Sequence, residues 1–335
     1  MQLKWIPPRW AGPGRAFAPA LAAPAEAAPP AGFLPRWVFS LLAGIALLDL
    51  AWLALSPLSL DWASARGPIT GILFASSLLM LCRMLAPPRR LVLLAQGLCF
   101  LMVAWPTLRL FNHLAMSTAF PLADPLLSGW DRALGFDWLG YLRLLDGSPA
   151  LLAAMDWAYT GLDYYSCFTF LALVLFGCER RAREFLLLFL LTAVGATGIG
   201  LFFPALAATA FYKPDPALFA HLTGTEGTYH LDLLHALRTD PSHVLTFRFM
   251  PGLTTFPSFH TAMGLICVWC ARGTLLFVPL TLLNLLMIAS TPVFGSHYLV
   301  DLIGGVAVTA GAVLLLRRLQ TPELKEGKSA ETHHF

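Results

Sequence analysis

Long apolar stretches alternate with short polar segments along most of the chain. The apolar stretches run approximately over residues 37–55, 69–85, 91–111, 151–176, 185–206, 256–270, 274–293 and 298–316. Each is close to the ~20 residues that a helix needs to cross the hydrocarbon core of a bilayer. The pattern predicts an all-α protein, a polytopic membrane bundle of about eight transmembrane helices.

The composition changes along the chain and suggests four regions. Residues 1–35 are rich in alanine and proline, and their prolines interrupt any helix. We expect a flexible cytoplasmic leader over 1–35, two accessory transmembrane helices over 36–90, a membrane core over 91–318 and a cytoplasmic tail over 319–335.

The overall composition excludes a water-soluble domain. Apolar residues make up 57% of the 335 positions, and charged residues make up 12%, about half the charged fraction of a soluble domain. The 22 basic and 19 acidic residues are nearly balanced and scattered, so nucleic acid is not an expected partner. Cys267 and Cys270 have the spacing of a zinc or redox pair, but no second pair accompanies them. We interpret them as core-packing thiols.

The distribution of lysine and arginine predicts the orientation, because basic loops stay on the cytoplasmic side. With both termini inside, fifteen of the 22 basic residues fall in inner segments. The outer segments then hold Arg66, Arg109, Arg132, Arg143, Lys213, Arg238 and Arg248. Arginine outnumbers lysine 18 to 4, which favours the inner membrane of a GC-rich bacterium with a site facing the periplasm. A secretory-pathway membrane with a lumenal site is the alternative.

Two long polar segments fall on the outer side. Residues 112–150 are acidic and aromatic and predict a short helix lying in the membrane interface as an anchor. Residues 207–255 carry four histidines and lead directly into a fifth, His260. With His113 and His297, seven of the nine histidines lie on this side. We therefore expect any chemistry to face outward.

Two histidines each begin an apolar stretch. His260 and His297 are 37 positions apart, enough chain for one crossing and its return, so both imidazoles reach the same face. Asp301 follows His297 at i+4, within hydrogen-bonding reach on a helix. A carboxylate that accepts from one ring nitrogen fixes the tautomer and leaves the other nitrogen basic. The alternative is a structural His–Asp contact that only locks two helices together.

Two motifs in this region resemble a known family. Pro257-Ser258-Phe259-His260 is similar to the Pro-Ser-x-His block of the type 2 phosphatidic acid phosphatase superfamily. The spacing from Ser290 to His297 and Asp301 matches its next block, Ser-Arg, five residues, His, three residues, Asp. His297 followed by Tyr298 resembles the branch that contains inositol phosphorylceramide synthase and sphingomyelin synthase. The resemblance covers roughly residues 100–316 and implies a six-helix lipid-phosphatase-like core.

The resemblance implies a role for each matched residue. His297 is the nucleophile that takes the phosphoryl group, Asp301 orients it, and His260 is the general acid that protonates the leaving lipid alkoxide. Ser258 donates its hydroxyl to the phosphate. Tyr298 packs or hydrogen-bonds beside it.

Three departures from the family pattern concern the phosphate-binding groups. Thr291 stands where the phosphatases have arginine, Phe259 replaces a usual glycine, and the family's first block, lysine followed by arginine-proline, has no match. Phosphoryl transfer requires charge neutralisation on the equatorial oxygens. The long outer segment offers Lys213, Arg238 and Arg248 as candidates, which otherwise are solvated or headgroup-contacting charges.

A polar stripe marks the 151–176 stretch. Asp156, Tyr159, Thr160 and Asp163 occupy positions i, i+3, i+4 and i+7. The stripe either binds a polyol headgroup or forms hydrogen bonds between helices. No carboxylate cluster with Mg²⁺ or Ca²⁺ spacing and no phosphate-binding loop appears in the sequence, so neither a metal nor a cofactor is required.

These features together predict an integral-membrane enzyme whose partners are membrane lipids at the outer leaflet. The missing arginine and the His297-Tyr298 pair favour a lipid phosphotransferase acting through a phosphohistidine. Hydrolysis of phosphatidic acid-like or isoprenyl phosphates is the alternative. A haem or quinone protein using the two histidines would be coloured or redox-active. A proton-coupled transporter using the Asp156–Asp163 stripe would show flux without a covalent intermediate.

Overall fold

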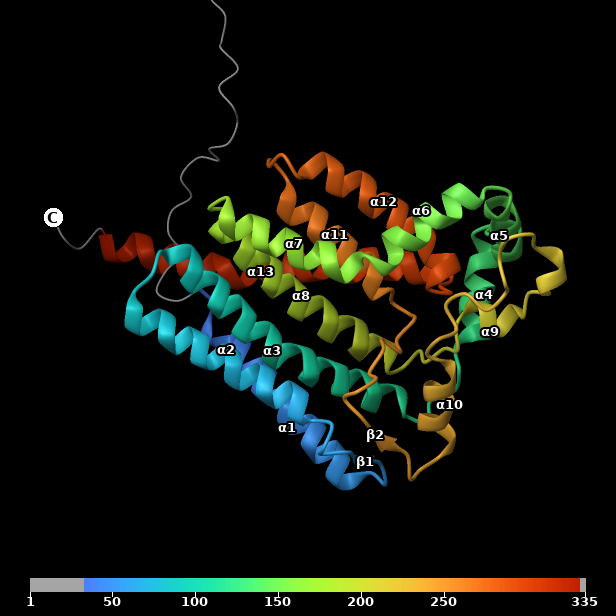
Figure 1. Ribbon diagram of the computed structural model, residues 1–335, viewed down its shortest axis with the longest axis horizontal. Coiled ribbons are helices and arrows are strands. Elements are labelled where there is room, and N and C mark those ends of the chain that lie inside the picture. Colours follow the sequence, from blue (N-terminus) through green and yellow to red (C-terminus); the bar gives the residue numbers. More distant parts are fainter. Residues whose placement is uncertain (1–32, 332–335) are drawn as a thin grey trace, which may run out of the picture.

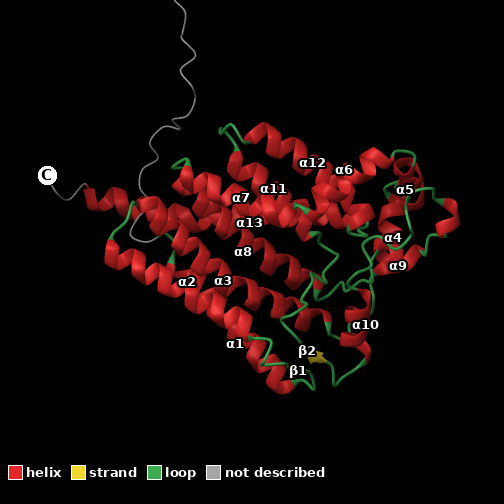
Figure 2. Ribbon diagram, in the orientation of Figure 1, coloured by secondary structure: helices red, strands yellow, loops and turns green. Residues whose placement is uncertain are grey.

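The computed structural model describes residues 33–331, which form an elongated helical bundle with loops gathered at one end (Figures 1 and 2). All but the last three positions of the predicted leader lie outside the described residues. The same holds for the last four residues of the predicted tail.

The bundle is built from helices that correspond to the predicted apolar stretches. They are α1 (Arg36–Leu55), α2 (Arg66–Leu85), α3 (Arg89–Met116), α6 (Pro149–Thr160), α7 (Leu162–Leu175), α8 (Glu179–Gly200), α11 (Phe259–Ala271), α12 (Phe277–Phe294) and α13 (Leu299–Glu331). Six are long and apolar enough to cross a membrane: α1, α2, α3, α8, α12 and the Leu299–Leu319 part of α13. The shorter apolar helices α7 and α11 lie within the same bundle. The chain is therefore an all-α polytopic membrane protein.

The predicted crossing over 151–176 is divided into two helices at Gly161. A Cβ at this position would lie 2.8 Å from the carbonyl oxygen of Trp157, so the close approach of the backbone requires glycine. The chain bends there, and α6 and α7 run in different directions (Figure 1).

The polar segments meet at the end of the bundle on the right in Figure 1, which we call the site end. Between α3 and α6 lie α4 (Asp124–Ala133) and α5 (Trp138–Asp146). Between α8 and α11 lie α9 (Ala208–Tyr212), a 3₁₀ turn (Pro216–Leu218) and α10 (Leu231–Thr239). The strand β1 (Ser59–Leu60) pairs in parallel with β2 (Val244–Leu245), tying the α1–α2 turn to the long loop.

The prediction of one interfacial helix over 112–150 is wrong in number and in burial. The segment folds into two short helices, and several of their aromatic and acidic side chains point into the protein. Trp138 and Asp131 are both fully buried, and the Trp138 indole donates to the carbonyl of Pro292. Hydrogen-bond partners inside the protein make this burial favourable.

The core centres on α8, which packs against α3, α7, α11 and α13. Its buried leucines, Leu186, Leu187, Leu188 and Leu190, are nearly inaccessible. Cys267 and Cys270 of α11 are fully buried in the same apolar cluster, in agreement with their interpretation as packing residues. α1 and α2 both pack against α3, so α3 separates them from the rest of the bundle (Figure 1).

Candidate active site

The connection between α12 and α13 holds His297 in one orientation. Nδ1 of His297 lies 3.0 Å from Oδ2 of Asp301, and the same carboxylate oxygen accepts the backbone N–H of Tyr298 at 2.9 Å. Both side chains are buried. The contact assigns the Nδ1 proton to the Asp301 hydrogen bond, so Nε2 carries the lone pair.

The lone pair on Nε2 of His297 points towards the hydroxyl of Ser258. Its Oγ lies 3.3 Å from Nε2 of His297 and accepts the N–H of Thr261 as the N-cap of α11. The backbone N–H of Ser258 also donates to the carbonyl of Asp301 at 2.9 Å. The start of α11 is therefore held directly against the start of α13.

His260 lies on the first turn of α11 and faces His297. The two ring centroids are 6.2 Å apart and the planes are inclined by 63°. On its other side His260 stacks on Tyr159 of α6, with centroids 4.4 Å apart and planes within 12°. The structure thus brings together the two histidines, Asp301 and Ser258 as the sequence predicts.

Burial makes His297 a neutral base. The loss of hydration lowers the pKa of His297 to about 4. The imidazole is therefore unprotonated near pH 7, which a nitrogen nucleophile requires.

Two carboxylates of α4 hold the start of α13. Asp131 accepts the backbone N–H groups of Leu299 and Val300, both at 2.9 Å. Asp124 accepts the hydroxyl of Tyr298 at 3.0 Å and the backbone N–H groups of residues 206 and 207. Tyr298 therefore packs beside the site, fully buried, and anchors it to α4.

The three basic candidates of the long loop occupy different places. The Arg238 guanidinium donates to the carbonyls of Met116, Thr118 and Phe120, so it fixes the end of α3. Lys213 and Arg248 are exposed at the site end. Thr291, at the position of the family's arginine, is buried and donates its hydroxyl to the carbonyl of Ile288.

The predicted polar stripe of Asp156, Tyr159, Thr160 and Asp163 is split between two helices, because the break at Gly161 separates α6 from α7. Tyr159 is buried against His260, whereas Asp156 is exposed. Asp163, beyond the break at Gly161, lines a cavity described below. The stripe therefore does not act as one surface.

His230 is a third imidazole of the site that the sequence analysis did not single out. It lies just before α10, the charge of His297 acts on it, and its Nε2 has no hydrogen-bond partner among the described residues. Burial lowers the pKa of His230 to about 4. Nothing local in the sequence distinguishes it from the other histidines of this loop.

Arg109 is the second residue that was missed. It lies on α3 and interacts electrostatically with Asp163 and Tyr229, and its charge acts on His260. Its signal was present in the sequence, because arginine within an apolar stretch is costly unless it serves a site.

A search among the described residues finds no group of three or more histidine, cysteine, aspartate or glutamate side chains arranged to hold a metal ion. The arrangement of two facing imidazoles, one of them backed by a carboxylate, is suited to nucleophilic and acid–base chemistry.

Comparison with known proteins gives one match. The family model described as the PAP2 superfamily matches residues 125–315, from α4 into α13. No curated protein and no solved structure matches the chain.

Proposed function

Because the chain belongs to the PAP2 superfamily, we propose that it is an integral-membrane lipid phosphotransferase that moves a phosphoryl or phospho-alcohol group from one lipid to another. The observation that carries the proposal is the arrangement around His297. Its Nδ1 is held by Asp301 at 3.0 Å, its Nε2 lies 3.3 Å from Oγ of Ser258, and its ring centroid lies 6.2 Å from that of His260.

The first half of the reaction forms a phosphohistidine. The Nε2 lone pair of His297 attacks phosphorus while the bond from phosphorus to the lipid oxygen breaks. Protonated His260 gives its proton to the leaving alkoxide, which departs as an alcohol. Asp301 stabilises the positive charge that develops on the His297 ring. The hydroxyl of Ser258 moves from Nε2 to a phosphoryl oxygen.

The second half returns the enzyme to its starting state. An acceptor hydroxyl attacks the phosphorus and gives its proton to the now neutral His260. The nitrogen–phosphorus bond breaks, and His297 regains its lone pair. The acceptor decides the outcome, since a lipid hydroxyl gives transfer and water gives hydrolysis.

Two features of the sequence favour transfer, and the family match on its own favours hydrolysis. Thr291 replaces the arginine of the family's phosphatases, and the His297-Tyr298 pair resembles the lipid headgroup transferases, which favours transfer. Membership of the PAP2 superfamily on its own favours a lipid phosphate phosphatase, which is our second candidate.

The test follows labelled phosphorus in vesicles that contain the purified protein, a phosphorus-labelled lipid donor and a hydroxyl-bearing lipid acceptor. We expect a new labelled lipid to form faster than free phosphate or free phospho-alcohol. An acid-labile, base-stable adduct on the protein identifies the intermediate. Label found only in water-soluble products overturns transfer and establishes hydrolysis.

The variant His297→Ala is compared with His235→Ala, which removes an exposed histidine of the same end of the protein. We expect His297→Ala to lose about a thousandfold or more of the rate and to form no adduct, while His235→Ala matches the wild type. Equal turnover by His297→Ala rules out this mechanism.

A further inference from the structure

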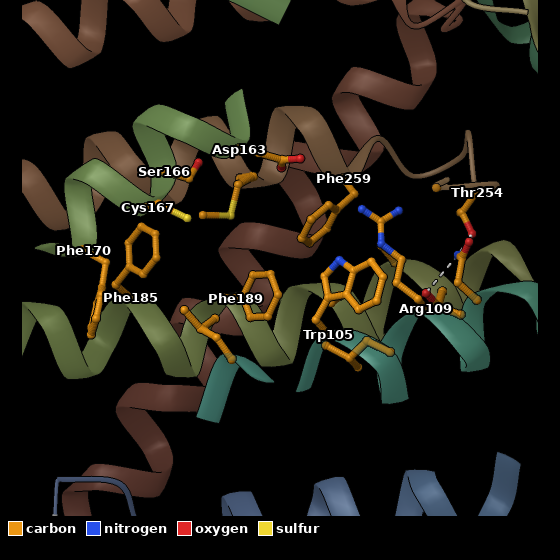
Figure 3. Close-up of a pocket in the computed structure, with 18 of the residues that line it drawn as sticks. Trp105, Arg109, Asp163, Ser166, Cys167, Phe170, Phe185, Phe189, Thr254 and Phe259 are labelled. Atoms are coloured by element: carbon orange, nitrogen blue, oxygen red, sulfur yellow. Dashed lines mark hydrogen bonds between the residues drawn. The ribbon is translucent and has the colours of Figure 1, made fainter. Parts of the chain in front are cut away.

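An elongated cavity of about 370 Å³ lies between α3, α7, α8 and α11, beside the candidate active site. Its volume is at the lower end of the ~300–1,000 Å³ of ligand pockets. Figure 3 shows aromatic side chains along its length, with Arg109 and Thr254 at one end and Phe170 and Phe185 at the other.

The lining changes from polar to apolar along the helix axes. Most of the polar lining residues, Arg109, Asn112, Asp163, Thr197 and Thr254, lie towards the site end. Ser166 and Cys167 follow along α7, and Leu101, Phe170, Phe185 and Phe189 lie deeper in the bundle. At 1.5 Å per residue, Arg109 and Leu101 are about 12 Å apart along α3, and Thr197 and Phe185 about 18 Å along α8. The gradient matches an amphiphile aligned with the bilayer normal.

The cavity opens sideways between α3 and α7. Trp105 of α3 is 40% exposed and Cys167 of α7 is exposed, yet both line the cavity. Because α3 crosses the membrane and α7 is apolar, these side chains border on lipid. A molecule that enters here comes from the bilayer.

The polar end of the cavity adjoins the catalytic residues. Phe259 lines the cavity, and the next residue, His260, faces His297. The charges of Arg109 and Asp163 both act on His260. Arg238 is engaged by three carbonyls, and α3 lies outside the segment matched by the family model. Arg109 is therefore a cation that the family comparison does not reveal.

We propose that the cavity binds one hydrocarbon chain of a membrane lipid phosphate, which enters between α3 and α7, while Arg109 at its polar end binds the phosphate. Asp163 orients the guanidinium. The inference rests on the proposed function and adds the place where the substrate binds: its chain reaches Phe170 and Phe185, and its phosphate lies at Arg109.

The test uses binding rather than turnover. The purified full-length protein in detergent is exposed to dodecylphosphonate with a diazirine at the chain end, illuminated, and digested for mass spectrometry. The phosphonate cannot be transferred. We expect labelling on the α7 and α8 peptides that line the deep end, competed by unlabelled dodecylphosphonate but not by methylphosphonate or dodecanol at the same concentration.

Two kinds of variant test the two halves of the proposal. Arg109→Gln is expected to weaken competition by dodecylphosphonate about tenfold or more. Ala193→Phe places a ring inside the cavity and is expected to abolish deep-end labelling, whereas Ile199→Phe adds the same ring at a 38% exposed position of the same helix and leaves labelling unchanged. Ala196→Leu, a smaller addition at another lining position, gives partial loss if the larger variant fails to fold.

The results separate the two proposals. Labelling spread over the exposed faces of α1 and α2, or equal in Ala193→Phe and wild type, overturns the cavity proposal even if transfer activity is present. Deep-end labelling that depends on Arg109, in a protein that transfers no phosphorus, supports the binding site and overturns the enzymatic proposal.

Discussion

At the scale of single residues, the two ring nitrogens of His297 have different roles in the site. Asp301 holds Nδ1 and Ser258 approaches Nε2. The i+4 spacing of His297 and Asp301 is local, so the sequence predicts the contact reliably. His230 reaches the site only through tertiary packing, which no local pattern reveals. The position of Arg109 within an apolar stretch indicates a functional role, but only the packing of α3 shows that it lies near His260.

The role of His260 as general acid can be tested by changing the leaving group of the donor. In His260→Ala we expect transfer from an alkyl lipid phosphate to fall by roughly a hundred- to ten-thousand-fold, the contribution of a positioned acid. An aryl phosphate leaves without protonation, so its rate of adduct formation should fall far less. Burst kinetics with both donors measure the difference, and an equal loss for both contradicts the acid role.

Protonation of the buried His230 makes the folding stability of the protein depend on pH. Burial lowers its pKa from 6.5 to about 4 in the folded protein, so the unfolded chain binds more protons between these values. Folding stability then rises with pH across this interval and is lost as pH falls from about 6.5 to about 4. We expect His230→Gln to flatten this part of a thermal-unfolding profile against pH.

The control for this measurement is His235→Gln, at an exposed position of α10. It should retain the wild-type pH dependence. An unchanged profile in His230→Gln shows that other groups cause the acid sensitivity.

At the scale of elements, α4 positions the turn that carries His297. Its two carboxylates bind the start of α13, the Tyr298 hydroxyl and the loop after α8. The sequence indicated an interfacial anchor because the acidic and aromatic residues of this segment are typical of a membrane surface. Partners far along the chain, which no local pattern reveals, bury them instead.

Asp131→Ala removes the acceptor for two backbone N–H groups at the first turn of α13. Loss of a helix cap costs about 0.5–2 kcal/mol, which lowers the unfolding temperature by a few degrees. We also expect kcat to fall more than the affinity for the donor lipid changes, because His297 loses its alignment. Asp131→Asn, which keeps an acceptor oxygen, should recover part of both.

The matched control is Asp137→Ala, since Asp137 is exposed and its side chain makes no capping hydrogen bond at α5. Its unfolding temperature and kcat should equal those of the wild type. Equal behaviour of Asp131→Ala and Asp137→Ala contradicts the role of α4.

At the scale of the whole molecule, the apolar stretches predicted the bundle well because length and hydropathy are properties of each segment alone. The break at Gly161 and the cavity beside α3 depend on how segments pack. The sequence therefore predicts the helical bundle and the convergence of the two histidines, but not the cavity between α3, α7, α8 and α11.

The charge distribution predicts that the site end faces the periplasm. In spheroplasts, Asp232→Cys at the exposed start of α10 should react with a membrane-impermeant maleimide. Arg90→Cys, exposed at the opposite end, should react only after lysis. The reverse pattern overturns the orientation while leaving the site unaffected.

The contacts between α4 and α13 also have a consequence for biosynthesis. His297 and Asp301 belong to the last part of the bundle to leave the ribosome, whereas their supports at Asp124 and Asp131 are made about 170 residues earlier. A nascent chain that has inserted everything up to α12 holds His260 but not yet His297 and Asp301. Under the proposed mechanism, reaction with membrane lipids therefore begins only once the final helix has been inserted, and a chain that ends before α13 is inactive.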